Sequence, residues 1–536
     1  MSVIENIPLI GKYFKREPSE ARTYHGIDSV RRRATVLFYP IRALFRAIAK
    51  TQHSEIEAIG LENIPPDGAV FLVGNHPNSL LDFFNLISVV RHPVATAAKD
   101  TIADMPVFGY LLKNHAMMIP VARAQDKAES GMSEEERQRK NEEMVQNAVE
   151  ALVTGRLFNI YAEGRSTDSR KLNKIKLGFM MLALQAEKQF NYNLNLRIVP
   201  YGYYYDRINK FQSSVLVIFG KPFTLRSLSE MPDDFLALPE ARQIAIEKKI
   251  MLAGKNRLQG DIEDLIVSIS DPNLVGLIDD ITSLYVLSPI KYMGQYENIR
   301  EKYTLGKNIS ESIQAAAAEP RGRELLEKLR RLIDDYRKRL GSARLPDALI
   351  RREYTIASLG YHIKAMLSAL VAAPAAIYGY IVNFIPRQAG RFIRYLVIDV
   401  KKRPRVDGDE SAIIYAFVAA IITYPIWGVL IYWLFQAHAF EPVAAFAGRV
   451  FGPEAVAFLK DWRVAAGLIP AMLMVYFMPA AWRFSIKHEN GFKSSLFFLK
   501  DAVTEFFRRN RLRDLRERRH EIIDTMDFII GDYNNK

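Results

Sequence analysis

Residues 69–82 read AVFLVGNHPNSLLD, an apolar run, a polar turn and the start of a second apolar run. Such runs are typical of a buried strand followed by a helix. The pattern predicts that His76 emerges at a strand end, with Asp82 six residues later in the first turn of a helix. A neutral imidazole held by a carboxylate can take a proton from a hydroxyl group, so His76 is a candidate general base and Asp82 its partner.

The same residues allow a plainer interpretation. Ser79 and Asp82 have the Ser-x-x-acid spacing of a capping box, which would only start the helix. His76 would then be an ordinary loop histidine. The motif alone leaves both interpretations open.

The composition indicates a basic protein with a soluble part and a membrane part. The 536 residues allow two or three domains, and the hydrophobic residues, 49% of the chain, are unevenly distributed. The net charge of +13 favours anionic partners, either nucleic acid or lipid head groups. The basic residues cluster beside hydrophobic segments, and no zinc-finger, P-loop or aromatic RNA-binding motif accompanies them, which favours lipid.

The chain contains no cysteine. Disulfides, thiol catalysis and Cys-ligated metals are therefore excluded. The N-terminus lacks the long apolar core of a secretory signal, so the catalytic part is expected to stay in the cytoplasm.

Strand and helix patterns alternate after the N-terminal segment, which predicts an α/β domain with a largely buried sheet. A charged region with helical periodicity follows and predicts a helical domain. Expected strands lie at 69–73, 116–121, 157–162, 197–203 and 215–219, and expected helices at 79–89, near 103–112, 133–153 and 177–188.

The last third carries three apolar segments of roughly membrane length, at 365–385, 412–435 and 464–482. Basic residues follow the first and the third segment, and the positive-inside rule places both basic stretches in the cytoplasm. Pro374 at the centre of the first segment favours a re-entrant or in-plane helix there, with full crossings by the other two. The expected location is a bacterial inner membrane, with the catalytic domain on its cytoplasmic side.

Residues 30–50 mix basic and apolar side chains at helical spacing. This mixture fits a helix in a membrane interface or, equally, a helix packed on its own domain. The expected division is an N-terminal segment 1–54, an α/β domain 55–225, a helical domain 226–350, a membrane domain 351–486 and a basic cytoplasmic tail 487–536.

Residues 161–168 read YAEGRSTD directly after an expected strand. Arg165 can bind a phosphate bidentately, while Glu163 can orient backbone donors or an acceptor hydroxyl. An ordinary turn is the alternative. Lys174 and Lys176 add positive charge before the next helix.

Two further motifs also follow strand patterns. Residues 119–123 (IPVAR) place Arg123 at a strand end, where a surface ion pair is the alternative role. Residues 198–202 (IVPYG) form an apolar strand interrupted by proline, which is expected to shape the site without reacting.

Taken in order, these four blocks resemble the glycerolipid acyltransferase superfamily, which includes glycerol-3-phosphate and lysophosphatidate acyltransferases. The resemblance runs from about residue 55 to residue 223 and implies an α/β fold whose mixed sheet is flanked by helices, followed by a helical region and C-terminal transmembrane helices. It implies that His76 and Asp82 are catalytic. The substrate-binding residues that it implies are Asn75, Arg123, Glu163, Gly164, Arg165, Ser166 and Lys176.

The chain departs from the family pattern at three points. Five residues separate His76 from Asp82 where most members have four, which resembles the membrane-embedded fungal glycerol-3-phosphate acyltransferases. Tyr161 and Ala162 replace the usual Phe-Pro. An arginine often found two positions after the glycine is Ser166 here, with Arg165 one place earlier.

The resemblance implies transfer of a fatty acyl group from acyl-CoA or acyl carrier protein to a glycerol-phosphate hydroxyl in phospholipid biosynthesis. The acceptor is glycerol 3-phosphate or 1-acylglycerol 3-phosphate, and no metal or cofactor is required. The expected partners are the donor, the acceptor and a bilayer with anionic head groups, and no nucleic acid. The alternative is an inactive, membrane-anchored lipid-binding or tethering protein.

Overall fold

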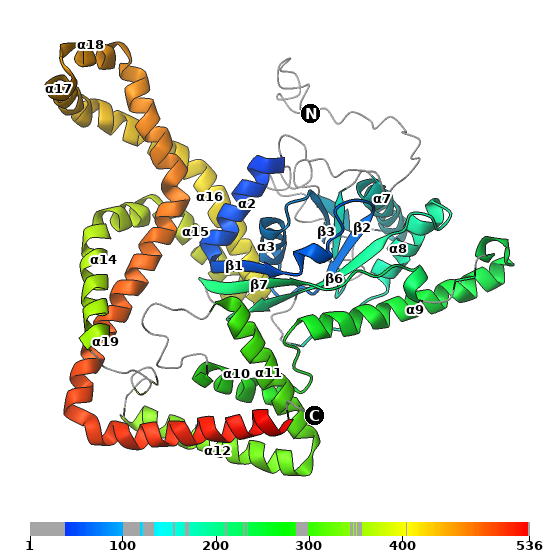
Figure 1. Cartoon of the computed structure of the whole chain (residues 1–536). Helices are drawn as coiled ribbons and strands as arrows, with labels where there is room; N and C mark the ends of the chain where they lie inside the picture. The colour runs from blue at the N-terminus through cyan, green and yellow to red at the C-terminus, as the bar shows by residue number, and fades with distance from the viewer. Residues whose placement is uncertain are drawn as a thin grey trace.

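The computed structural model describes residues 38–99, 118–121, 133–153, 156–166, 171–208, 212–228, 231–232, 234–285, 298–343, 347, 350, 356–403 and 405–533. Arg123 and the helix predicted near 103–112 lie outside these residues. The described part combines one sheet, its covering helices, a helical region and a set of long apolar helices (Figure 1).

The sheet has seven strands in the order β1-β7-β6-β2-β5-β3-β4. Only the β6–β7 pair is antiparallel, so the sheet is mixed, as the resemblance implies. The strands are β1 (His53–Ile59), β2 (Val70–Gly74), β3 (Val94–Lys99), β4 (Met118–Val121), β5 (Leu157–Tyr161), β6 (Arg197–Tyr205) and β7 (Ser213–Phe219).

The central strands carry apolar side chains on both faces of the sheet, so helices cover both faces. On one face, Phe71 and Phe158 pack under α7 (Glu134–Val153), α8 (Gly178–Gln189) and α9 (Glu240–Leu265). On the other face, Leu72 and Tyr201 share a core with α2 (Phe38–Gln52) and α3 (Leu80–Val89). The fold is therefore a three-layer α/β sandwich in this part of the chain (Figure 1).

The five predicted strands are present, with ends shifted by up to two residues. Helices α3, α7 and α8 likewise match the predicted ones closely. Strands β1 and β3 were not predicted. HSEIEAI in β1 carries polar residues between its apolar ones at the sheet edge, and VATAAK in β3 is rich in alanine, so neither has the Val/Ile/Phe content that identifies a strand.

Helix α2 packs on its own domain. Phe45 is fully buried and stacks on Phe84 of α3, with ring centroids 4.7 Å apart. Tyr39 at the start of the helix is exposed. The apolar face of the predicted amphipathic helix is thus occupied by the protein, and contact of its basic face with a membrane stays a prediction.

The helical region predicted after the sheet is present. Residues Ile278, Ile313, Leu329 and Met526 share a separate core, to which the C-terminal part of the last helix contributes. Its helices are α10 (Pro272–Tyr285), α11 (Ile299–Ala318) and α12 (Pro320–Ala343), together with the end of α19 (Arg463–Tyr533).

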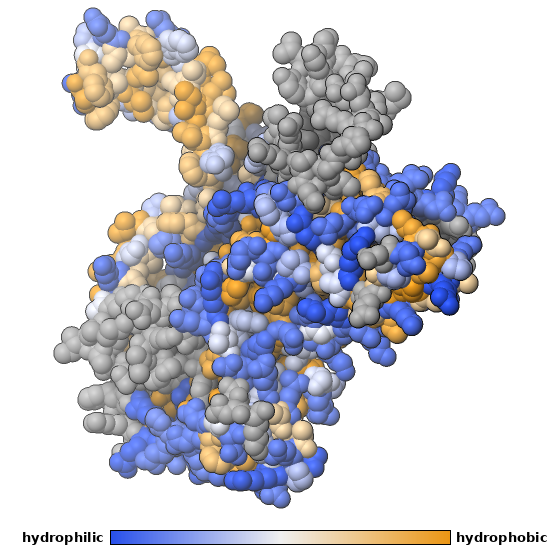
Figure 2. Space-filling model, turned by 45° about the vertical axis from the view of Figure 1, so that its right-hand side comes forward, coloured by the Kyte–Doolittle hydropathy of each residue, from blue (hydrophilic) through white to orange (hydrophobic). Residues whose placement is uncertain are grey.

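In the described part of the chain, three helical stretches are long and apolar enough to cross a membrane, at His362–Val382, Ser411–Phe451 and Arg463–Lys500. They are built from α14 (Ile356–Val382), α16 (Arg405–Leu434), α17 (Phe440–Phe451) and the start of α19, with α15 (Phe384–Tyr395) and α18 (Pro453–Asp461) as connections. The end of α16, helices α17 and α18 and the start of α19 form an apolar arm that projects from the rest (Figure 1 and Figure 2). This composition is compatible with a membrane protein.

Two observations bear on the predicted membrane segments. Helix α14 continues through Pro374 without interruption and packs along the middle of α19, where Tyr378 donates a hydrogen bond to the Met474 carbonyl oxygen. The segment 464–482 is the start of α19, which runs unbroken to Tyr533. Which segments cross the bilayer, and in which direction, stays a prediction.

Candidate functional site

His76 and Asp82 face each other at the carboxyl end of β2. The distance from His76 Nδ1 to Asp82 Oδ2 is 2.8 Å. His76 lies two residues after Gly74, the last residue of β2, and Asp82 lies in the first turn of α3. The pair predicted from the sequence is therefore formed, in the position where α/β proteins bind their ligands.

The capping-box interpretation is wrong. Ser79 makes no side-chain capping bond to α3, and its backbone has φ 49°. The carboxylate of Asp82 instead accepts hydrogen bonds from the Asn78 amide at 2.7 Å and from the Tyr205 hydroxyl at 2.6 Å. With the His76 imidazole, three donors, two from the turn after β2 and one from β6, satisfy a carboxylate that is completely buried.

Tyrosines of β6 support this carboxylate from the sheet. Tyr201 of β6 is paired with Gly74, the last residue of β2, and β6 continues four residues beyond this pair. In this overhanging end, Tyr203 and Tyr205 point to the same face of the sheet as each other. The Tyr203 hydroxyl donates to the Asp82 backbone carbonyl oxygen at 2.5 Å. Burial, followed by the charge of Asp82, raises the pKa of Tyr205 well above its usual value, so this phenol remains a donor.

The imidazole of His76 is held from a second side by Tyr161. The two rings stack with centroids 3.8 Å apart and planes 5° from parallel. Because Asp82 accepts from Nδ1, that nitrogen carries the proton of the neutral ring and Nε2 carries the lone pair. The arrangement gives a base whose orientation is set before a substrate binds.

Glu163 ties the His76 turn to the next strand end. Its Oε1 accepts a hydrogen bond from the His76 amide at 2.7 Å, and its Oε2 accepts from the Asn173 amide at 3.0 Å. Glu163 is buried. It thus orients backbone donors, one of the two roles predicted for it; the other, contact with an acceptor hydroxyl, stays a prediction.

Two cations lie beside this turn. Gly164 has φ 72°, and a Cβ there would come within 2.8 Å of Lys176 Nζ, so only glycine allows the ammonium group to approach this closely. Lys176 and Arg165 are exposed, and neither forms an ion pair with a described carboxylate. They leave positive charge beside His76 for an anionic ligand.

The other predicted substrate-binding residues have structural contacts. The side-chain oxygen of Asn75 accepts a hydrogen bond from the Tyr203 amide at 2.9 Å, and Asn75 is buried. The Ser166 hydroxyl accepts from the Ser79 amide at 2.8 Å. Both side chains hold the His76 turn, and their contact with substrate stays a prediction, as does that of Arg123.

The network continues to β1. The amide nitrogen of Asn85 lies 3.0 Å from the Tyr205 hydroxyl and 3.3 Å from His53 Nε2. Burial lowers the pKa of His53 to about 4. His53 is therefore neutral in the folded protein and accepts from Asn85 through Nε2.

Sequence reasoning missed Tyr205, Tyr203 and Asn173. The run YGYYY at 201–205 contains a signal, since alternate tyrosines on a strand share one face. Nothing local shows that this face meets Asp82. Among the described residues, no group of three or more His, Asp or Glu side chains is placed to hold a metal ion.

Comparison with known proteins finds relatives of the α/β part of the chain. Residues 55–204 match the model of the family described as Acyltransferase. Over 140 residues the chain is 27% identical to glycerol-3-phosphate O-acyltransferase 1 of Saccharomyces cerevisiae, a match that covers 26% of this chain and 17% of the yeast protein. The resemblance to the glycerolipid acyltransferase superfamily is confirmed for this part of the chain, which spans about a sixth of that curated relative.

A solved structure is also similar in part. The 1-acyl-sn-glycerophosphate acyltransferase PlsC from Thermotoga maritima is 17% identical, with a TM-score of 0.26, over 41% of this chain and 80% of that chain. A score this low adds nothing to the fold described above.

Replacing Tyr205 with phenylalanine tests the support of the buried carboxylate. We expect Tyr205→Phe to lower the free energy of unfolding by about 1–3 kcal/mol, because a buried charged acceptor loses a donor. The measurement is thermal unfolding of the purified protein. Tyr204→Phe is the matched control, since the Tyr204 hydroxyl lies on the opposite face, 3.3 Å from the Lys302 carbonyl oxygen; equal effects of the two substitutions would contradict the assignment.

Protonation of His53 gives a pH dependence of stability. The pKa is about 4 in the folded state against 6.5 for the free side chain, so the unfolded chain binds the proton first as pH falls. We expect about 3 kcal/mol of stability, present above pH 6.5, to be lost as the pH falls to about 4. His53→Asn should be less stable at neutral pH and should lack this part of the slope; an unchanged slope in that variant would refute the prediction.

Proposed function

We propose, from the acyltransferase-family domain at residues 55–204, that the protein transfers a fatty acyl group from a thioester donor to a hydroxyl of a glycerol phosphate. The donor would be acyl-CoA or acyl carrier protein. The acceptor would be glycerol 3-phosphate or 1-acylglycerol 3-phosphate. The observation that carries the proposal is the 2.8 Å contact between His76 Nδ1 and buried Asp82, next to two cations that have no ion-pair partner among the described residues.

The reaction needs one base and no covalent acyl-enzyme. His76 Nε2 takes the proton from the acceptor hydroxyl, and the oxygen attacks the thioester carbonyl carbon. The C–S bond then breaks. The leaving thiolate takes the proton from His76 and departs as the free thiol, which restores the neutral imidazole. Asp82 keeps the ring in the required tautomer and stabilises the imidazolium formed during attack.

The charged turn supports a phosphate-bearing acceptor. The Lys176 side chain lies against Gly164, and Arg165 is the next residue after Gly164 in the sequence. Glu163, just before them, accepts the hydrogen bond of the His76 amide. An arginine can bind a phosphate with two hydrogen bonds, and a lysine adds a point charge. The phosphate of glycerol 3-phosphate would thus be bound within the same turn that positions the base.

The long apolar helices fit a lipid product. Moving an acyl chain from a bilayer into water costs about 0.8 kcal/mol per methylene group. A site attached to membrane helices avoids this cost, because the product can pass directly into the lipid. The proposed location is therefore a membrane, with the catalytic domain on its cytoplasmic side.

Removal of the imidazole tests the proposed base. We expect His76→Ala to lower acyl transfer by about 10²–10⁴-fold with an unchanged unfolding temperature, because general-base assistance is lost. The assay is radiolabelled acyl transfer by purified protein with each donor and acceptor. His520→Ala, at an exposed histidine of α19, is the control. Activity of His76→Ala within tenfold of wild type would exclude this role, and an inactive wild-type protein would support the tethering alternative.

Removal of the two cations tests phosphate binding. We expect Arg165→Gln with Lys176→Gln to raise KM for glycerol 3-phosphate by about tenfold or more, since charge-assisted hydrogen bonds are lost. The value of kcat should change much less. Lys248→Gln, at an exposed position of α9, should behave like wild type; an unchanged KM in the double variant would place the phosphate elsewhere.

A further inference from the structure

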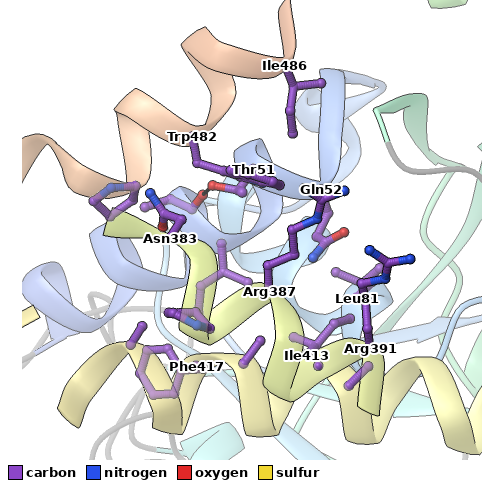
Figure 3. Close-up of a pocket in the computed structure, with 18 of the residues that line it drawn as sticks. Thr51, Gln52, Leu81, Asn383, Arg387, Arg391, Ile413, Phe417, Trp482 and Ile486 are labelled. Atoms are coloured by element: carbon purple, nitrogen blue, oxygen red, sulfur yellow. Dashed lines mark hydrogen bonds between the residues drawn. The ribbon is translucent and has the colours of Figure 1, made fainter. Parts of the chain in front are cut away.

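A cavity of about 1240 Å³ lies between the catalytic domain and the apolar helices. Helix α2 and the His76–Asp82 turn form one side, and α15, α16 and the start of α19 form the other (Figure 3). This volume exceeds the roughly 300–1,000 Å³ of pockets that hold small ligands. A molecule the size of glycerol 3-phosphate would leave most of it empty.

One end of the cavity reaches the catalytic turn. Asn78, Leu81 and Ile208 line it there. Asn78 donates its backbone amide to Asp82, and its side chain donates to the Ile208 carbonyl oxygen at 3.4 Å. A ligand that fills the cavity would therefore end beside the proposed base.

The opposite wall is apolar and belongs to helices outside the acyltransferase-family domain. Ala412, Ala416 and Ala420 of α16 lie one turn apart and leave room for a chain, with Phe417 beside them. From α19, Val475 and Trp482 complete the wall. These residues lie within or next to the segments that are long and apolar enough to cross a membrane.

Helix α15 adds positive charge. Arg387 and Arg391 are one turn apart, and Figure 3 shows both side chains extending from α15 toward the side where Gln52 and Leu81 lie. Arg387 lies over the Trp482 ring, 5.3 Å from its centroid, and neither arginine has an ion-pair partner among the described residues.

Two further arginines of the lining are largely neutralised. Arg394 and Arg405 share Asp409, at 2.5 Å and 3.5 Å. Glu489, also in the lining, is paired with Lys493. The charge available to a ligand is therefore positive and comes mainly from Arg387 and Arg391.

We infer that this cavity binds an anionic amphiphile with one long acyl chain. The chain lies between α16 and α19, and the phosphate lies by Arg387 and Arg391, so that the reacting end meets the His76 turn. The inference rests on the proposed function and deepens it, because it makes the C-terminal helices part of the substrate site. It also explains how a lipid substrate would pass between bilayer and catalytic domain without entering water.

Two proposed substrates carry this chemistry. A 1-acylglycerol 3-phosphate and a long-chain acyl-CoA each combine one acyl chain with phosphate. Both are tested with the full chain, using palmitoyl analogues that carry a diazirine on the acyl chain. Crosslinked positions are then mapped by peptide mass spectrometry in wild-type protein and in His76→Ala. Crosslinking requires only that the analogue binds, so the variant can be labelled even if it transfers no acyl group.

We expect both proteins to be labelled on the cavity faces of α16 and α19. Labelling by either analogue supports the site and identifies the source of the chain. Labelling by neither, or only at residues that face away from the cavity, would overturn it. If His76→Ala is labelled but wild type is inactive, the proposed reaction fails and the lipid site stands.

Filling the cavity from either wall is the second arm. Ala420→Trp on α16 and Ala47→Trp on α2 should each lower labelling by about tenfold or more, because the added ring occupies the space of the chain. Ile422→Trp is the matched control, since Ile422 is on the same helix but 60% exposed. Equal labelling of all three would overturn the inference, and the two walls provide independent variants should one fail to fold.

The third arm tests the charge. Arg387→Gln with Arg391→Gln should weaken binding of the phosphate-bearing analogue by about tenfold and leave a neutral monoacylglycerol analogue nearly unaffected. Lys401→Gln with Lys402→Gln removes the same charge from exposed residues outside the lining and should have little effect. Equal losses for both analogues, or for both double variants, would show that these arginines do not bind the phosphate.

Discussion

The buried carboxylate of Asp82 is the group on which the architecture of the candidate site depends. A carboxylate removed from water is tolerated only when donors replace the lost solvent. Here they come from two segments outside α3: the turn after β2, through Asn78 and His76, and the overhanging end of β6. Satisfying one buried charge therefore holds three segments together, and the same contacts give His76 its tautomer and orientation.

The parallel pairing of β2 with β5 is the second constraint. Gly74 is in register with Tyr161, so the turns that follow both strands begin at the same edge of the sheet. Glu163 of one turn can then accept from the His76 amide of the other. Tyr161 stacks on the same imidazole, which explains how an aromatic residue just before the Glu-Gly turn contributes to the site.

The apolar helices are joined to this site by packing as well as by sequence. Ile414 of α16 belongs to the same core as Leu72 and Tyr201 of the sheet. The cavity between them thus has one wall from the catalytic domain and one from helices of membrane length. This packing, which a flexible tether would lack, sets where the apolar wall lies relative to the His76 turn.

The sequence by itself determined the α/β pattern, five of the seven strands, the apolar helices and the His76–Asp82 pair, because each is encoded in a short stretch of chain. Tertiary structure decided what lies across from that stretch. Tyr205 supports Asp82 from 123 residues away, and Arg387 lines the same cavity as Leu81 although the two lie in separate parts of the chain. Strand register and helix packing join such distant residues, and no local pattern of residues records either of them.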